Sequence, residues 1–216
     1  MIAGIVLAGG ESRRMGRPKA SLEVEGETFL QRAVNTLIAG GCADVVIVID
    51  PDHPAGPERA FEGGVRSAAG SGPGSEQIDS LRSGLRATSA SAEAAVVMPV
   101  DHPLVRPETV AALIAAFAEG GGEALIVRPT FQGKHGHPVL FSAALFGELL
   151  HGAAPEGAEG AEGAEGARSV VRSHAGAVSD VEVDDEGVLI DVDTPEEYER
   201  WLGGGGGGGG RGGGGV

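Results

Sequence analysis

The sequence predicts an α/β fold: a Rossmann-like three-layer α/β/α sandwich with a mostly parallel sheet and a small added β-hairpin. Short apolar runs over residues 2–7, 44–50 and 94–100 have the length and composition of buried strands. Segments with helical spacing separate these runs, and strands that alternate with helices form parallel sheets covered on both faces. The chain has 216 residues, of which 41% are hydrophobic, so it can build one sizeable core.

The other elements follow from local patterns. Thr194, Pro195 and Glu197 occupy the N-cap, first and third positions of a terminal helix, which together predict a capped start. Helices are expected over residues 28–39, 79–87, 107–118, 142–150 and 194–202, short strands over 125–127 and 139–141, and a hairpin over 181–192 with its turn at 185–187. Residues 51–76 are rich in Gly, Pro, Ala and Ser and predict a weak helix or a loop.

Two segments have low complexity. Residues 155–167 repeat Glu-Gly-Ala, and residues 203–216 are nearly all glycine. A glycine tail has nothing to bury and is expected to be flexible. The sequence therefore predicts one domain over residues 1–202, followed by a disordered tail over 203–216.

The net charge of −15 excludes some partners. With 31 acidic and 16 basic side chains, the surface repels nucleic acid and anionic membranes. Cys42 is the single cysteine, so no internal disulfide is possible, which is typical of a reducing compartment. The first residues lack the leading positive charge of a signal peptide, and no run approaches the roughly 18 apolar residues of a membrane span. We expect a cytoplasmic protein.

A glycine- and arginine-rich loop follows the first strand. It begins Leu7-Ala8-Gly9-Gly10, and four of the 16 basic residues of the chain fall within residues 13–19. Consecutive glycines let backbone N–H groups approach an oxyanion, while Arg and Lys neutralise and orient phosphate oxygens. The pattern matches neither Walker A nor the Rossmann fingerprint. It favours a triphosphate site; the structural alternative is a glycine-rich turn with a solvated basic rim.

The loop resembles the signature of a known family. Leu7-Ala8-Gly9-Gly10, Arg14-Met15-Gly16 and Lys19 are similar to the phosphate loop of MobA-like NTP transferases, the family of molybdenum cofactor guanylyl- and cytidylyltransferases. The resemblance covers about residues 2–202 and implies a nucleotide-diphospho-sugar-transferase-like fold. It also implies that the loop, including Gly9, Gly10 and Gly16, wraps the NTP phosphates, and that Arg14 and Lys19 contact them during catalysis.

Two acidic segments are candidates for a magnesium site. Asp101-His102-Pro103 directly follows the strand over 94–100, and the carboxyl ends of parallel strands share one edge of the sheet. A carboxylate beside a triphosphate suits Mg²⁺, which takes one or two carboxylates plus phosphate oxygens. The resemblance assigns this role, and a part in catalysis, to Asp101, and a second metal contact to Asp193. The alternatives are an Asp-Pro turn and an acidic turn that caps the last helix.

Two further segments resemble family motifs. Residues 77–85 are similar to the segment that lines the base and ribose, which implies that Ser80 and Gly84 lie near the nucleotide; an ordinary amphipathic helix is the alternative. Residues 133–141 are similar to the acceptor segment of the cytidylyltransferase branch, which makes Lys134 and His137 candidates for contact with an anionic acceptor. His135 and His137 alternate like a metal pair, but no third ligand accompanies them.

We therefore expect a magnesium-dependent nucleotidyltransferase. It would transfer NMP from an NTP, with CTP favoured, to a small phosphorylated acceptor such as molybdopterin, and release pyrophosphate. Gly9-Gly10 is guanylyltransferase-like, whereas residues 137–141 are cytidylyltransferase-like, so a guanylyltransferase or a sugar-phosphate nucleotidyltransferase stays open. A non-catalytic nucleotide-binding module and a structural protein tethered by its glycine tail are the alternatives of another class. A molybdoenzyme or its chaperone is a candidate partner, and a monomer or weak dimer the expected assembly.

Overall fold

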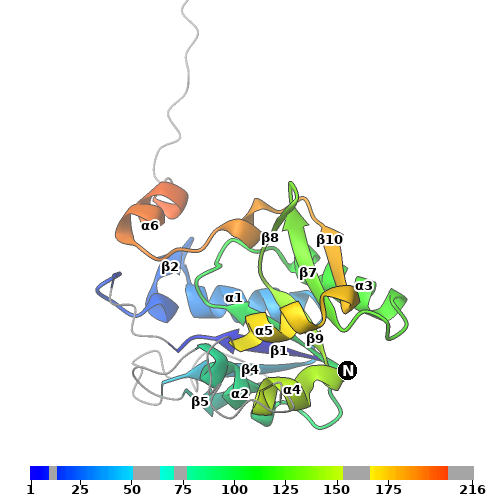
Figure 1. Ribbon diagram of the computed structural model, residues 1–216. Coiled ribbons are helices and arrows are strands. Elements are labelled where there is room, and N and C mark those ends of the chain that lie inside the picture. The colour runs from blue at the N-terminus through cyan, green and yellow to red at the C-terminus, as the bar shows by residue number, and fades with distance from the viewer. Residues whose placement is uncertain (10–13, 51–63, 71–76, 153–165, 204–216) are drawn as a thin grey trace, which may run out of the picture.

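The fold is built around one central β-sheet (Figure 1). In this computed structural model the described residues are 1–9, 14–50, 64–70, 77–152 and 166–203. They form an 8-stranded sheet in the order β10-β7-β9-β6-β1-β4-β5, with β8 paired to β7. The middle strands β1 (Ile2–Leu7), β4 (Asp44–Ile49) and β6 (Ala94–Pro99) are parallel, and β4 and β6 are buried along their whole length. The three apolar runs are thus confirmed as buried parallel strands.

The remaining strands extend the sheet on both sides. β5 (Val65–Ala69) adds to β4 in parallel, and β10 (Val178–Glu182) adds to β7 (Ile126–Phe131) in parallel. β9 (Val139–Ser142) runs antiparallel between β6 and β7, and β8 (Lys134–His135) forms a hairpin with β7. A separate small hairpin joins β2 (Glu23–Val24) to β3 (Glu27–Thr28). The sheet is mostly parallel, as predicted.

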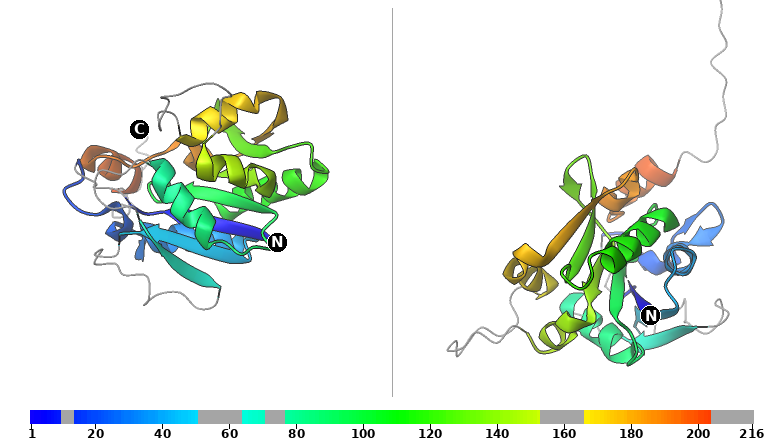
Figure 2. Two further views of the ribbon diagram at one scale, coloured as in Figure 1. Left: turned by 60° about the horizontal axis from the view of Figure 1, so that its bottom comes forward. Right: turned by 90° about the vertical axis from the view of Figure 1, so that its right-hand side faces the viewer.

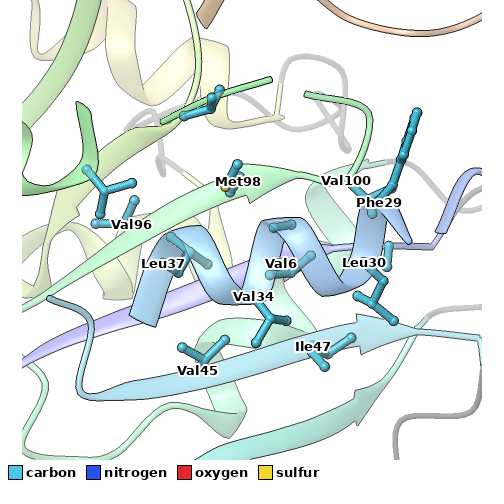
Figure 3. Close-up of a cluster of buried hydrophobic side chains, with 14 of the residues drawn as sticks. Val6, Phe29, Leu30, Val34, Leu37, Val45, Ile47, Val96, Met98 and Val100 are labelled. Carbon is cyan, nitrogen blue, oxygen red and sulfur yellow. The ribbon is translucent and has the colours of Figure 1, made fainter. Parts of the chain in front are cut away.

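Helices cover both faces of the sheet (Figures 1 and 2). α1 (Phe29–Ala39) and α3 (Pro107–Glu119) pack on one face, while α2 (Gln77–Ala87), α4 (Phe146–His151) and α5 (Gly166–Ser173) pack on the other. The alternation of side chains along β1 divides the core accordingly. Val6 joins the cluster under α1, drawn in Figure 3, whereas Ile5 and Leu7 join the cluster under α2.

Helix ends agree with the sequence signals. α1 begins after Thr28 and α6 (Pro195–Leu202) after Thr194, each with a complete capping box. Pro107 opens α3 at its first turn. Ile38 departs from the prediction: the spacing placed it on the inner side of α1, but the residue is 43% exposed. The part of the chain that the structure describes contains no helix long and apolar enough to cross a membrane.

The predicted hairpin over 181–192 is wrong. β10 ends at Glu182, and the segment continues as the 3₁₀ helix η5 (Glu186–Leu189) instead of returning as a second strand. The reason is Asp185, whose buried carboxylate accepts hydrogen bonds from Arg106 N (2.9 Å) and Thr109 Oγ1 (2.6 Å) at the start of α3, and from Gly187 N (3.0 Å). The Asp-Glu-Gly sequence therefore fixes a loop against α3 rather than a hairpin turn.

The predictions for residues 51–76 and 142–150 need correction, and those for the two low-complexity segments fall largely outside the described residues. The residues 51–76 were expected to hold a weak helix or a loop, but their described part contains strand β5. The helix expected over 142–150 begins as the 3₁₀ helix η3 (Ala143–Leu145) before α4. The glycine tail after residue 203 and most of the Glu-Gly-Ala repeat lie outside the described residues.

Candidate nucleotide and metal site

The glycine loop leaves the sheet at the end of β1. Ala8 N donates to Val48 O (2.8 Å), and Val100 N donates to Leu7 O (3.0 Å), so β1, β4 and β6 end together. The chain then continues to exposed Gly9. Gly10, the fourth residue of the predicted Leu-Ala-Gly-Gly motif, lies outside the described residues, which resume at Arg14.

Lys19 joins the two predicted metal ligands. It begins the 3₁₀ helix η1 (Lys19–Ser21), and its Nζ lies 2.8 Å from Asp101 Oδ2 and also donates to Asp193 Oδ1. Arg14 Nη2 lies 2.8 Å from Asp193 Oδ2. These residues are up to 179 positions apart in sequence. The four residues that the sequence singled out by motif are thus one ion-paired cluster.

A backbone hydrogen bond brings the two acidic segments together. Val192 N donates to Asp101 O (2.9 Å), which places the residues before α6 beside the loop after β6. Glu197 Oε2 then accepts from Asp193 N (2.8 Å) and Thr194 N (2.9 Å). The interpretation of this segment as a helix cap is therefore confirmed, and the cap also fixes the backbone from which Asp193 reaches Lys19.

The ion pairs favour the charged forms of Lys19 and Asp193. Burial alone would lower the pKa of Lys19, but the charges and hydrogen bonds of Asp101 and Asp193 outweigh it, so the pKa lies above its ordinary value. The hydrogen bond from Lys19 in turn lowers the pKa of Asp193, against a smaller opposing effect of burial. Both carboxylates and the ammonium are only 16–24% exposed, so each interaction is screened less than at an open surface.

The carboxylates suit a hard divalent cation. Asp101 and Asp193 converge on one ammonium group, so a single cation can be shared between them. Within the described segments no group of three or more His, Cys, Asp or Glu side chains could hold a metal. A metal here would take its other ligands from phosphate and water, as Mg²⁺ does at triphosphate sites. The same finding gives no support to a zinc site around His135 and His137.

A pair of contacting histidines, His102 and His137, lies beside Asp101. The rings of His102 and His137 are tilted against each other with centroids 4.9 Å apart. Both Nδ1 atoms are buried and have no hydrogen-bond partner among the described residues. Burial lowers the pKa of His102, and burial together with the neighbouring His102 lowers the pKa of His137 to about 4. The backbone N–H of His137 donates to Val188 O (2.9 Å), which holds this residue in place. The pair is uncharged at neutral pH.

A cavity of about 750 Å³ opens on the α2 side of the site. Leu7 and Pro99 contribute from the ends of β1 and β6, His137 and Val139 from the acceptor segment, and Arg168 from α5. The acceptor segment predicted from residues 133–141 thus forms part of its wall. Lys134 does not: it is exposed on β8, outside the cavity lining.

The predicted nucleotide residues of α2 have different surroundings. Ser80 is buried beside the glycine loop, since a Cβ added to Gly9 would lie 3.4 Å from Ser80 Oγ. Gly84 faces the sheet, where an added Cβ would lie 2.6 Å from Ile5 Cγ2. The missing side chain of Gly84 thus lets α2 lie close to β1. Gly16 has a φ of +68°, a conformation that glycine adopts without strain.

Sequence reasoning missed several residues around the site. Arg128, Arg168 and Arg172 line the cavity, yet none belongs to a motif that the sequence offered. Arg168 and Arg172 are four positions apart, which places them on one face of α5. That spacing was the available signal, but it does not say which way the face points. Asp185 was assigned to a turn and is instead a buried anchor.

Comparisons with known proteins agree with this geometry. The model of the MobA-like NTP transferase domain matches residues 4–178. A probable molybdenum cofactor guanylyltransferase of Opitutus terrae is 38% identical over 122 residues, 56% of this chain, and the chain spans 58% of that relative's length. The purine catabolism protein PucB of Bacillus subtilis is 30% identical over 210 residues, which cover 92% of this chain and 94% of PucB.

Solved structures share the fold. The Rv0371c homologue from Mycobacterium sp. strain JC1 superposes with a TM-score of 0.75 at 29% identity, covering 94% of this chain and 95% of the other. The manganese complex of Rv0371C from Mycobacterium tuberculosis superposes with a TM-score of 0.71 at 25% identity, covering 94% and 98%. The predicted α/β fold, of the nucleotide-diphospho-sugar transferase type, is thereby confirmed.

Proposed function

The chain belongs to the MobA-like NTP transferase domain family, a family of nucleotidyltransferases, and we propose that it transfers NMP from an NTP to a small phosphorylated acceptor. The observation that carries the proposal is the cluster of Lys19, Asp101 and Asp193 beside the glycine loop. Cations for a triphosphate and carboxylates for a divalent metal meet there at the carboxyl edge of the sheet. This is where ligands of open α/β sheets bind.

The residues divide the work by charge. The glycine loop from Leu7 to Gly10 offers backbone N–H groups to the triphosphate, and Arg14 and Lys19 offset its negative charge. Asp101 and Asp193 would hold Mg²⁺, which neutralises charge on the phosphates and aligns the attacking oxygen. Manganese in the Rv0371C complex supports a divalent ion at this fold.

The reaction is an in-line displacement at the α-phosphorus. An oxygen of the acceptor phosphate forms a bond to this phosphorus while the bond to the pyrophosphate oxygen breaks, and pyrophosphate leaves with the electron pair. Lys19 and Arg14 compensate the charge that develops on the leaving group. Ser80 lies beside Gly9 and would contact the nucleoside, and Gly84 lets α2 approach closely enough for this contact.

CTP is the donor that we propose, with molybdopterin as the acceptor. The support is the acceptor segment: its cytidylyltransferase-like residues, including His137, form the wall of the cavity beside the site. Lys134 is proposed to meet the same acceptor from the exposed hairpin of β7 and β8. A molybdoenzyme or its chaperone would then receive the product.

Guanylyl transfer is the second candidate, and Gly9 favours it. Among the described residues, an added Cβ at Gly9 would make one ordinary contact, 3.4 Å from Ser80 Oγ. Packing against these residues does not require glycine, so we take the Gly9-Gly10 pair as the guanylyltransferase-like form of the loop. The guanylyltransferase relative of Opitutus terrae agrees with this candidate.

Pyrophosphate release tests the proposal. The protein is incubated with Mg²⁺, molybdopterin and CTP, GTP, ATP or UTP in turn; we expect turnover with CTP, and turnover with GTP alone would select the second candidate. Asp101→Asn should lower turnover by about 100-fold or more, because the metal loses a charged ligand. Asp184→Asn changes an exposed carboxylate that belongs to no predicted metal or nucleotide segment and serves as the matched control. Tight NTP binding without turnover for any acceptor would identify a non-catalytic binding module instead.

A further inference from the structure

The cavity beside the site has a one-sided charge. The protein has 31 acidic and 16 basic side chains, yet no Asp or Glu occurs among the described residues that line the cavity. Three arginines do: Arg128 from β7, and Arg168 and Arg172 from α5. A cationic wall in a chain of net charge −15 indicates a ligand that is itself anionic.

Arg128 is held in place before any ligand arrives. Its Nε lies 2.5 Å from Asp180 Oδ1 and its Nη2 lies 3.3 Å from Asp180 Oδ2, a two-pronged pairing across β7 and β10. Its Nη2 also lies 3.3 Å from His135 Nε2. This pairing fixes the plane of the guanidinium, so Arg128 can orient a ligand at little further entropy cost.

The arginines of α5 are differently placed. Ala167, Arg168, Val171 and Arg172 all line the cavity, so this face of α5 borders it. Both arginines are exposed, and no carboxylate of the described chain forms an ion pair with Arg168. Arg168 and His137 line the same cavity, and the charge of Arg168 makes a small contribution to the lowered pKa of the His137 ring. Arg168 therefore carries positive charge into the space between α5 and the acceptor segment.

The rest of the wall is apolar. Leu7 and Leu81 line the cavity beside the glycine loop, and Val139 and Phe141 line it from β9. At about 750 Å³ the cavity is far larger than a phosphate ion and lies in the range of sites for drug-sized ligands. Its occupant accordingly combines an anionic group with a ring-sized apolar or aromatic body.

We infer that Arg168 and Arg172 bind the phosphate of the acceptor, that Arg128 supports them, and that together they select phosphorylated acceptors over neutral ones. The inference rests on the proposed function, because it names the acceptor site of that reaction. Arginine suits this task, since its planar fork donates two hydrogen bonds to one phosphate. The apolar wall then receives the body of the acceptor.

Binding measurements test the inference without turnover. The full chain is titrated with two matched probe pairs, 6-hydroxymethylpterin and its phosphate ester, and glucose and glucose 1-phosphate. We expect the phosphorylated pterin to bind about ten- to a hundredfold more tightly than the alcohol, the range of one or two charge-assisted hydrogen bonds. Arg168→Gln and Arg172→Gln should each reduce that ratio about tenfold, and Arg168→Lys should restore part of it.

Controls separate the site from general effects. Arg86→Gln removes an exposed arginine from the last turn of α2, outside the cavity lining, and should leave the ratio unchanged. Each variant should also keep most of its NTP-induced thermal shift, because Arg168 and Arg172 belong neither to the phosphate loop nor to the cluster of Lys19, Asp101 and Asp193. In turnover assays the Gln variants should raise the KM for the acceptor far more than they lower kcat.

The outcomes distinguish this inference from the proposed function. The inference is overturned if neither phosphate ester binds more tightly than its neutral partner, or if Arg168→Gln and Arg172→Gln leave the ratio intact while pyrophosphate release continues. If the ratio responds as expected but no NTP releases pyrophosphate, the anion site stands and nucleotidyl transfer fails.

Discussion

Replacing Asp185 should destabilise the fold, even though this residue belongs to no proposed ligand site. Its carboxylate is 4% exposed and accepts three hydrogen bonds, from Arg106 N, Thr109 Oγ1 and Gly187 N. In Asp185→Asn one oxygen becomes an NH₂ group, so at least one buried N–H faces another donor. Each buried group left unsatisfied costs about 1–3 kcal/mol, and the side-chain cap of η5, in which Asp185 accepts from Gly187 N, is weakened as well. We expect a loss of about 2–4 kcal/mol.

Urea unfolding and calorimetry measure this loss. For a chain of this length about 2–4 °C of Tm corresponds to 1 kcal/mol, so Tm should fall by about 4–16 °C. Asp184→Asn removes the same charge from the exposed neighbouring position and should change stability by less than about 0.5 kcal/mol. Equal effects of the two variants would refute the reasoning, because the loss would then come from charge and not from the buried hydrogen bonds.

Three other predictions follow from single contacts. Gly84→Ala would bring a Cβ to 2.6 Å from Ile5 Cγ2 and should destabilise the fold by about 1–3 kcal/mol in urea unfolding. Gly147→Ala would meet no atom of the described residues within 4 Å and should not destabilise it. The pKa of His137 falls from 6.5 to about 4 on folding. The neutral ring therefore contributes stability that is complete above pH 6.5 and is lost as the pH falls towards 4. The urea midpoints at pH 7 and pH 5 should differ less in His137→Gln than in the wild type. Lys19→Met should tighten Mn²⁺ binding to the NTP-free protein several-fold in a spectroscopic titration, because the ammonium no longer competes for the carboxylates, and an unchanged Kd would contradict such competition.

Much of the site could be predicted because the fold gathers strand ends. Lys19 and Asp101 are 82 residues apart, yet both follow strands whose carboxyl ends lie at one edge of the sheet. The order of apolar runs was sufficient to place them together. The motif before α6 predicted Asp193 as a site residue. The structure shows what brings it near Asp101: a hydrogen bond from Val192 N to Asp101 O.

The errors arose where one sequence pattern has two physical uses. The sequence Asp-Glu-Gly is typical of turns, but the carboxylate of Asp185 can also accept hydrogen bonds from the start of a helix. Its partner here, Arg106, lies 79 residues away in the sequence. Gly84 is similar: glycine signals close approach, and the sequence does not say whether a nucleotide or Ile5 approaches. In both cases the deciding contact is long-range.

The arginines of α5 could not be assigned from sequence for a third reason. The spacing of Arg168 and Arg172 predicts a shared face, but which face borders a cavity depends on how α5 docks. A Glu-Gly-Ala repeat precedes the helix and carries no register to fix that docking. In the folded protein, residues of α5 line the same cavity as residues of β9 and the end of β1.

Under the proposed function, the ion pairs of Lys19 would let an acidic protein receive an anionic ligand. In the ligand-free protein Lys19 and Arg14 neutralise Asp101 and Asp193, so the site presents neither bare carboxylates nor unpaired cations from this cluster. Under the proposed function, a nucleotide that arrived with its metal would offer each group a better partner: the carboxylates would gain a divalent cation and the side-chain cations would gain phosphate oxygens. This exchange would keep the local charge nearly balanced in both states. Metal and nucleotide binding would then depend on each other, since either ligand alone would leave one set of charges without a counterpart.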